Sequence, residues 1–102
     1  MCIKVGVLEV RRTAEFLDWF TALQDVQARA RIAKRIDRVT IGNFGDTKPV
    51  GEGVSELRFT VGPGYRVYYT QQGDIVAILL CGYEKGSQER DIERAKALAK
   101  EI

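Results

Sequence analysis

The segment Glu56–Tyr69 constrains the fold of this 102-residue chain more strongly than any other. Two runs that alternate between polar and apolar residues, Glu56–Val61 and Tyr65–Tyr69, flank the tripeptide Gly62-Pro63-Gly64. Alternation with a period of two around a glycine-containing turn predicts a β-hairpin. The hairpin brings two arginines and several tyrosines together on a small sheet, so its pairing decides which of these side chains face solvent.

The pairing of the hairpin depends on the length of its turn. A three-residue loop pairs Val61 with Tyr65 and, further along, Arg58 with Tyr68. A two-residue Pro-Gly turn would instead pair Val61 with Arg66 and mix apolar with charged side chains. Because burying an unpaired arginine costs several kcal/mol, we favour the three-residue loop.

With this loop the hairpin has two distinct faces, since side chains alternate across a strand. The apolar face, which we expect in the core, carries Leu57, Phe59, Val61, Tyr65, Val67 and Tyr69. The polar face, which we expect to be open, carries Glu56, Arg58, Thr60, Arg66 and Tyr68. The sequence therefore predicts a surface with two guanidinium groups and a phenol.

Length and composition predict a single domain that spans residues 1–102. Hydrophobic residues make up 45% of the chain and charged residues 29%, as in ordinary globular proteins. No apolar run reaches membrane-spanning length and the N-terminus lacks a signal-peptide pattern, so we expect a cytoplasmic protein without a membrane partner. The net charge of +2 is only a weak indication of nucleic-acid binding.

The chain contains no histidine, which restricts the chemistry it can perform. Cys2 and Cys81 lack the CxxC spacing of a zinc site, so we expect no metal and no cofactor. Cys81 follows an apolar run and is expected to be a buried free thiol. Any reaction would rest on arginine, lysine, tyrosine and carboxylates, a set that suits a phosphate-bearing substrate.

Three stretches outside the hairpin have helical periodicity, and the first two follow the capping residues Thr13 and Asp25. The first repeats Phe16, Leu17, Phe20 and Leu23. The second, which ends at Gly42, has an apolar stripe of Val26, Ala30, Ala33 and Ile36, joined by Ile32 and Val39. The third, capped by Ser87, has a stripe of Ile92, Ala95, Leu98, Ala99 and Ile102.

Further strands are expected at Ile3–Val10 and Ile75–Leu80. Residues 42–53 contain four glycines and Pro49, and we expect a loop there with at most a short strand near Val50. The expected order is β-α-α-β-β-β-α. This is an α+β fold, in which an N-terminal helical hairpin and a C-terminal helix pack on a small, mainly antiparallel sheet.

Four blocks of sequence together resemble the RelE/ParE toxin superfamily, most closely its HigB-like "addiction module killer" branch. The blocks are Gly42–Lys48, Gly53–Arg58, Gly62–Tyr69 and Leu79–Ala95. The resemblance covers nearly the whole chain, and the expected order of elements agrees with the fold of that superfamily.

The resemblance implies the toxin of a bacterial type II toxin–antitoxin pair, neutralised by a helix-turn-helix antitoxin of the HigA type. RelE and HigB members cleave mRNA on the translating ribosome, whereas ParE members share the fold and inhibit DNA gyrase. A third alternative is a degenerate toxin that acts only as a co-repressor with its antitoxin. Clustered phosphate-binding side chains favour the ribosome-dependent endonuclease over a pure inhibitor.

A metal-independent endoribonuclease needs no protein nucleophile, because the 2′-OH of the substrate can attack the adjacent phosphate. Arg58 and Arg66 suit the charge that develops on that phosphate, since a guanidinium group is bidentate toward it, and Arg66 also matches an arginine of the RelE family. Lys85, through its match to the family motif, would neutralise the phosphate or the leaving group. Tyr68 would stack on a base or exchange a proton, and Glu56 is the alternative general base.

A basic stripe on the second helix is a separate candidate for RNA or ribosome binding. It consists of Arg31, Lys34, Arg35 and Arg38, whose spacing places them on one helix surface. Such a stripe is typical of a solvated helix face, and it also suits contact with ribosomal RNA or with an acidic antitoxin segment. Lys48, in the glycine-containing loop, is a further candidate for contact with the phosphate backbone.

Overall fold

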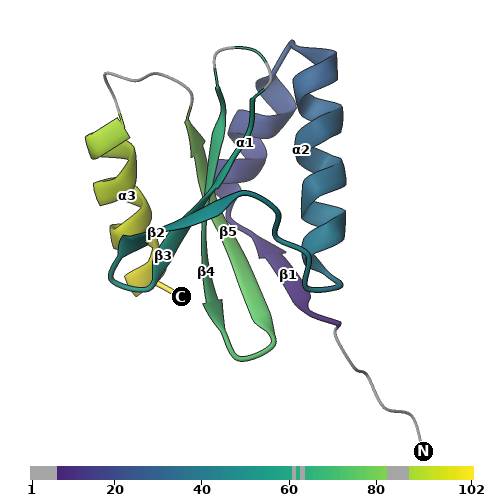
Figure 1. The fold of residues 1–102 in the computed structure, drawn as a ribbon. Helices are drawn as coiled ribbons and strands as arrows, with labels where there is room; N and C mark the ends of the chain where they lie inside the picture. Colours follow the sequence, from purple (N-terminus) through teal and green to yellow (C-terminus); the bar gives the residue numbers. More distant parts are fainter. Residues whose placement is uncertain (1–6, 61, 63, 83–87) are drawn as a thin grey trace, which may run out of the picture.

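A five-stranded sheet lies between two helical layers in the computed structural model of this chain (Figure 1). The structure describes residues 7–60, 62, 64–82 and 88–102. In chain order the elements are β1 (Glu9–Arg12), α1 (Ala14–Ala22), α2 (Val26–Val39), β2 (Thr47–Gly51), β3 (Val54–Arg58), β4 (Arg66–Gln72), β5 (Ile75–Gly82) and α3 (Gln88–Lys100). α1 and α2 cover one face of the sheet and α3 covers the other. The expected α+β fold is confirmed.

The strands follow the order β1-β5-β4-β3-β2. β2, β3, β4 and β5 form an antiparallel meander, and β1 runs parallel to β5 at one edge. β2 lies where the sequence predicts mainly a loop. A proline is tolerated there because β2 is an edge strand, where a missing N–H breaks no ladder, and the register shifts between Pro49 and Gly51.

The predicted first strand, Ile3–Val10, lies only partly within the described residues, because residues 1–6 are outside them. Val7 and Leu8 precede the strand, and β1 starts at Glu9. Arg11 and Arg12, which were expected to follow the strand, belong to it and pair with β5. The ladder continues into the start of α1, because the backbone N–H of Thr13 donates to the carbonyl of Ile78 (3.0 Å).

Two of the three N-caps that the sequence predicts, Thr13 and Asp25, are confirmed. Thr13 Oγ1 accepts a hydrogen bond from the backbone N–H of Phe16 (3.1 Å), and Asp25 Oδ1 accepts one from that of Ala28 (3.0 Å). Beyond the end of α2, Gly42 adopts φ +83°, a left-handed conformation that glycine takes without strain. These local signals fix where the helical hairpin starts, turns and stops.

The buried stripe of α2 differs from the predicted one. The residues that reach the core are Ala28, Ile32, Ile36 and Val39. The expected members that are exposed instead are Val26, Ala30 and Ala33. Ile32 and Ile36 lie four residues apart and bury far more apolar area than alanine does, so they determine which side of the helix faces the sheet.

The β3–β4 register is shifted by two residues from the predicted one. Arg58 pairs with Arg66 rather than with Tyr68, and Tyr68 pairs with Glu56. Beyond the ladder, the backbone N–H of Phe59, just after β3, donates to the carbonyl of Tyr65, just before β4 (3.0 Å), so the connection is longer than three residues. Because a shift of two preserves alternation, the two predicted faces are still correct.

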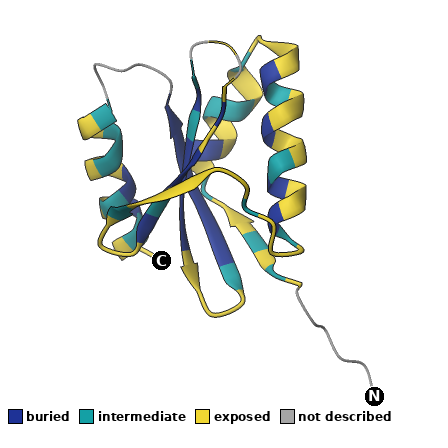
Figure 2. Ribbon diagram, viewed as in Figure 1, coloured by how far each residue is buried: buried dark blue, intermediate teal, exposed yellow. Residues whose placement is uncertain are grey.

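Two apolar clusters, one on each face of the sheet, hold the layers together. The larger cluster joins α1 and α2 to the sheet and includes Phe16, Ile32, Leu57, Phe59, Val67 and Tyr69. The smaller lies between α3 and the sheet and includes Val54, Tyr68, Leu79, Ala95 and Leu98. The central strands are therefore buried on both faces, as Figure 2 shows.

α3 buries only part of the stripe that the sequence predicts. Ala95 and Leu98 are buried, and Ile92 and Ala99 pack against them. Ile102 lies beyond the end of the helix and is exposed, so its inclusion in the stripe was wrong. The expected cap Ser87 falls outside the described residues. Within the described chain, no helix combines the length and the apolar character needed to cross a membrane.

Replacing Thr13 should destabilise the fold more than an ordinary threonine replacement does. Its hydroxyl caps α1 and also donates to the carbonyl of Leu79, so it ties the helix to β5. Thr13→Ala should lower the free energy of unfolding by about 1–2 kcal/mol in urea denaturation. Thr21→Ala is the control, because the exposed Thr21 hydroxyl bonds only carbonyls of its own helix, and we expect a change within about 0.5 kcal/mol. Equal losses in the two variants would contradict this role.

Candidate functional site

The face of the sheet that α3 covers ends in a group of charged side chains. Arg58 on β3 lies directly opposite Arg66 on β4, and Glu56 lies two residues before Arg58 on the same face. Lys48 of β2 is the cross-strand partner of Glu56 on its other side. We call these four residues, Lys48, Glu56, Arg58 and Arg66, the strand cluster. The predicted pair Arg58 and Arg66 is thus brought together, and Lys48 joins it from a strand rather than from a loop.

Each arginine of the strand cluster has a carboxylate beside it. Arg58 donates from Nη2 and Nε to Asp46 Oδ1 (3.0 and 3.3 Å), and about half of its side chain is exposed. Arg66 Nε lies 3.7 Å from Glu56 Oε2, too far for a good hydrogen bond, and its side chain is 21% exposed. Exposed ion pairs such as Arg58–Asp46 contribute only about 0–1 kcal/mol, so Arg58 can exchange its partner at low cost.

Glu56 is an unusual component of this group, because its carboxylate is buried. Its side chain is 3% exposed, and Oε2 has no hydrogen-bond partner. A buried carboxylate oxygen without a donor costs free energy, which is offset here mainly by charge from Arg66. Glu56 therefore holds Arg66 in place electrostatically without occupying the N–H groups of the guanidinium with close hydrogen bonds.

Tyr68 does not lie on the open surface that the hairpin pattern predicts. It is fully buried, packs in the cluster beneath α3, and pairs across the strands with Glu56. Burial raises the pKa of the Tyr68 phenol far above its ordinary value, and the negative charge of Glu56 raises it further. The expectation that Tyr68 stacks on a base is corrected by this burial, and its phenol is too weakly acidic to act as a base near neutral pH.

The N-terminal part of α3 lies against the end of β5, next to Arg66. Gly82 is the cross-strand partner of Arg66 on β5. A Cβ atom added at Gly82 would lie 2.2 Å from Asp91 Oδ2, so only glycine allows α3 to approach this closely. Lys85, the predicted catalytic lysine, lies outside the described residues between Gly82 and α3.

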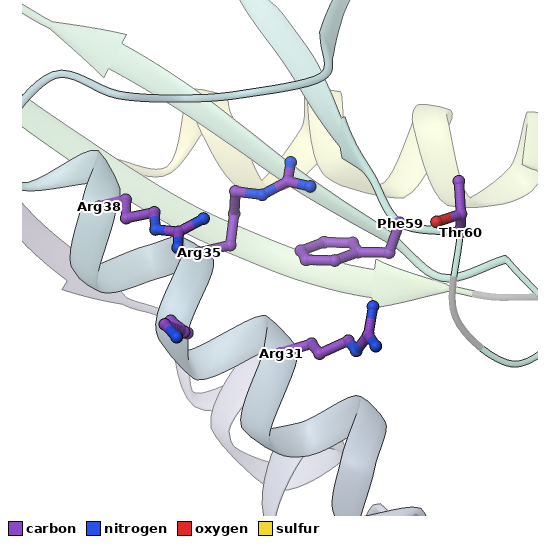
Figure 3. A pocket seen from close by; sticks show the side chains of 6 residues that line it. Arg31, Arg35, Arg38, Phe59 and Thr60 are labelled. Atoms are coloured by element: carbon purple, nitrogen blue, oxygen red, sulfur yellow. The ribbon is translucent and has the colours of Figure 1, made fainter.

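The four cations of the predicted basic stripe line one cleft of about 370 Å³ between α2 and the end of β3 (Figure 3). We call it the α2 cleft, and its lining residues are Arg31, Lys34, Arg35, Arg38, Phe59 and Thr60. The predicted clustering of these cations is confirmed. Phe59 and Thr60 were not predicted to join them, although the apolar face of the hairpin already pointed Phe59 toward the helices.

Arg35 has a structural part within this cleft. Its Nη1 and Nη2 atoms donate to the carbonyls of Phe44 and Arg58 (3.3 Å each), and its Cζ atom lies 4.5 Å from the centre of the Phe59 ring. Arg35 therefore fastens α2 to the end of β3 and to the loop before β2. Its removal would perturb the fold as well as the charge of the cleft.

The two cationic groups lie on opposite sides of the same strand end. Strand alternation directs Arg58 toward the α3 side and Phe59 toward the α2 side, while Arg35 bonds the backbone carbonyl that joins them. The strand cluster and the α2 cleft are therefore separate surfaces that share residues 58–60 as a common wall. Sequence reasoning also missed Asp46, whose pairing with Arg58 depends on the β2–β3 register.

This arrangement defines a small α+β protein with the RelE fold. Toxin RelE of E. coli, solved in the free state as a double arginine-to-alanine mutant, matches the structure with a TM-score of 0.69. The match covers 86% of this chain and 97% of the RelE chain, at 16% sequence identity, and at that identity it establishes the fold.

Sequence comparison gives a nearer relative. An uncharacterized protein of Haemophilus influenzae is 44% identical over 95 residues, which cover 93% of this chain and 96% of that protein. The chain belongs to the same family as this Haemophilus protein. No protein-family model matches the sequence.

The burial of Tyr68 and Cys81 should make the protein sensitive to alkali. Burial raises the pKa of both groups from ordinary values of 10.0 and 9.0, so the folded state keeps protons that the unfolded chain loses as the pH rises. These two groups should therefore leave the free energy of unfolding unchanged below pH 8 and lower it above pH 9–10, by up to about 1.4 kcal/mol per pH unit for each group. Urea denaturation at several pH values measures this dependence.

Tyr68→Phe separates the two contributions. The variant should lose the additional steepening above pH 10 and keep the earlier fall that Cys81 causes. An alkaline stability profile identical to that of the wild type would contradict the buried, neutral state of Tyr68.

Proposed function

We propose that this chain is the toxin of a type II toxin–antitoxin pair and that it cleaves mRNA bound to the ribosome. The observation that carries the proposal is the directly opposed pair Arg58 and Arg66, on a partly open sheet face of a RelE-like fold. Two like charges opposite each other destabilise a sheet, so a retained pair suggests an anionic ligand between them. This function implies that the protein acts in the cytoplasm and that its partner is a HigA-like helix-turn-helix antitoxin.

In the proposed reaction the 2′-OH of the substrate attacks the adjacent phosphorus, and the bond from phosphorus to the 5′-oxygen breaks. Arg66 stabilises the charge that gathers on the phosphorane, because Glu56, at 3.7 Å, does not occupy its Nε with a close hydrogen bond and 21% of its side chain is exposed. Arg58 exchanges Asp46 for a phosphate oxygen. Lys48, exposed at the edge of the cluster, contacts a neighbouring phosphate.

Proton transfer is the weaker part of this site. Tyr68 is buried and its pKa is raised, and the carboxylate of Glu56 is buried and paired with Arg66. Lys85 is the remaining candidate from the sequence for charge neutralisation at the leaving 5′-oxygen. A site of this kind contributes mainly charge stabilisation, so it gains most from a partner that aligns the RNA for attack. The ribosome supplies that alignment in the proposed function.

Two other functions make different predictions in cells. A ParE-like inhibitor of gyrase would induce a DNA-damage response and leave mRNA intact. A co-repressor without toxicity would cause no growth defect when expressed alone. Expression in a bacterial host, with mapping of mRNA 5′ ends, distinguishes both from codon-positioned cleavage.

Arg66→Ala should abolish toxicity in a protein that still folds but is less stable, because the variant leaves the buried Glu56 carboxylate without its counter-charge. Loss of one preorganised donor to the developing charge typically lowers the rate by about 10²–10³-fold. The measurement is growth after induction, together with mRNA cleavage on purified ribosomes and the urea midpoint of the variant. Arg12→Ala removes an equal charge from an exposed position of β1 and should stay toxic. A fully toxic Arg66→Ala variant would show that the strand cluster is not the catalytic site.

A further inference from the structure

The α2 cleft holds cations to which the described part of the chain brings no counter-charge. Among the described residues, no ion pair involves Arg31, Lys34 or Arg38, and the lining of the cleft includes no carboxylate. Like charges three and four residues apart on a helix repel each other and destabilise the helix. A surface that keeps this repulsion is suited to a ligand that brings negative charge.

The cleft matches an extended anion better than a small one. Residues 31 to 38 span two turns of α2, so the cations form a row about 10 Å long. Arg35 in the middle of the row is fixed by its two carbonyl partners and by Phe59. A polymer with regularly repeated negative charges can contact the whole row at once, whereas a single anion would meet only part of it.

The chemistry of the lining favours nucleic acid over an acidic protein segment. Stable protein interfaces need apolar anchor residues that fill buried pockets. The one apolar residue of the lining, Phe59, is 7% exposed and lies under the Arg35 guanidinium, so it offers no anchor site. The cleft therefore presents charge without the apolar core that a peptide would require.

The covered Phe59 ring also indicates which form of nucleic acid fits the cleft. Proteins that hold single strands stack bases on exposed aromatic side chains, and the Phe59 ring is not available for stacking. Double-helical RNA is recognised through phosphates and 2′-hydroxyls, which need only cations and polar groups such as the Thr60 hydroxyl. We propose that the α2 cleft binds the phosphate backbone of a folded, double-helical RNA while the strand cluster faces the single strand to be cut.

This inference rests on the proposed action on RNA, and binding assays test it independently of cleavage. The probes are an RNA hairpin with a stem of about 16 base pairs, an oligouridine of equal length, the corresponding DNA duplex and a polyglutamate peptide. The wild-type protein should bind the RNA hairpin about tenfold more tightly than oligouridine or polyglutamate, and no more weakly than the DNA duplex.

A triple variant tests whether the cleft is responsible. Arg31→Ala, Lys34→Ala and Arg38→Ala together spare Arg35 and add strong helix formers, so the fold should persist. The variant should bind the RNA hairpin about 100-fold more weakly, and the salt dependence of log K should fall by about 2–3, near one for each cation removed. The matched control removes three charges elsewhere, through Arg11→Ala, Arg12→Ala and Lys100→Ala, and should retain the binding of the hairpin.

Several outcomes would overturn the inference. Wild-type hairpin binding in the triple variant would exclude the cleft as the site. Cleft-dependent preference for polyglutamate would assign the cleft to an acidic protein, and preference for oligouridine or DNA would assign it to another nucleic acid. If the wild type binds the hairpin through the cleft but does not cleave mRNA on ribosomes, the proposed function fails and the binding site stands.

Discussion

The pairing of β3 with β4 is the constraint on which the other features of this protein depend. β4 is buried on both faces, with Val67 packed toward α1 and α2 and Tyr68 packed toward α3. A slip of one residue would direct Arg66 into one apolar cluster and expose Val67 on the other side. The cost of burying an unpaired guanidinium therefore determines which residues of β4 face each side of the sheet. It thereby also determines where the charged side chains lie at this end of the sheet.

The same strand end couples the two cationic surfaces. The carbonyl of Arg58 accepts a hydrogen bond from Arg35, and its side chain turns to the opposite face toward Asp46. Arg58 thus contributes its backbone carbonyl to the wall of the α2 cleft and its side chain to the strand cluster. An RNA held in the cleft would be positioned relative to the arginines by a rigid strand rather than by a flexible loop, which suits a site that contributes charge and little proton transfer.

The sequence predicts the two faces of the hairpin correctly but not the register in which β3 pairs with β4. Alternation identifies the polar face of the hairpin, and capping chemistry locates Thr13 and Asp25, because both signals are local. The register was wrong by two residues because turns whose lengths differ by two residues give the same faces, so alternation alone does not select between them. The burial of Tyr68 was not predictable either, since it depends on α3, which is distant in the sequence.

Charge balance explains why a buried carboxylate belongs in the strand cluster. Lys48, Arg58 and Arg66 bring three positive charges, and Glu56, Asp46 and Asp91, whose carboxylate lies beside Gly82, bring three negative ones, so the described charges balance. A phosphodiester that displaces Asp46 from Arg58 exchanges one negative charge for another and keeps that balance. The phosphorane of the proposed reaction carries a second negative charge, which the described residues leave unbalanced. In the proposed reaction a further cation would balance this charge in the transition state, and Lys85, three residues past Gly82, is the residue that the family motif offers for that role.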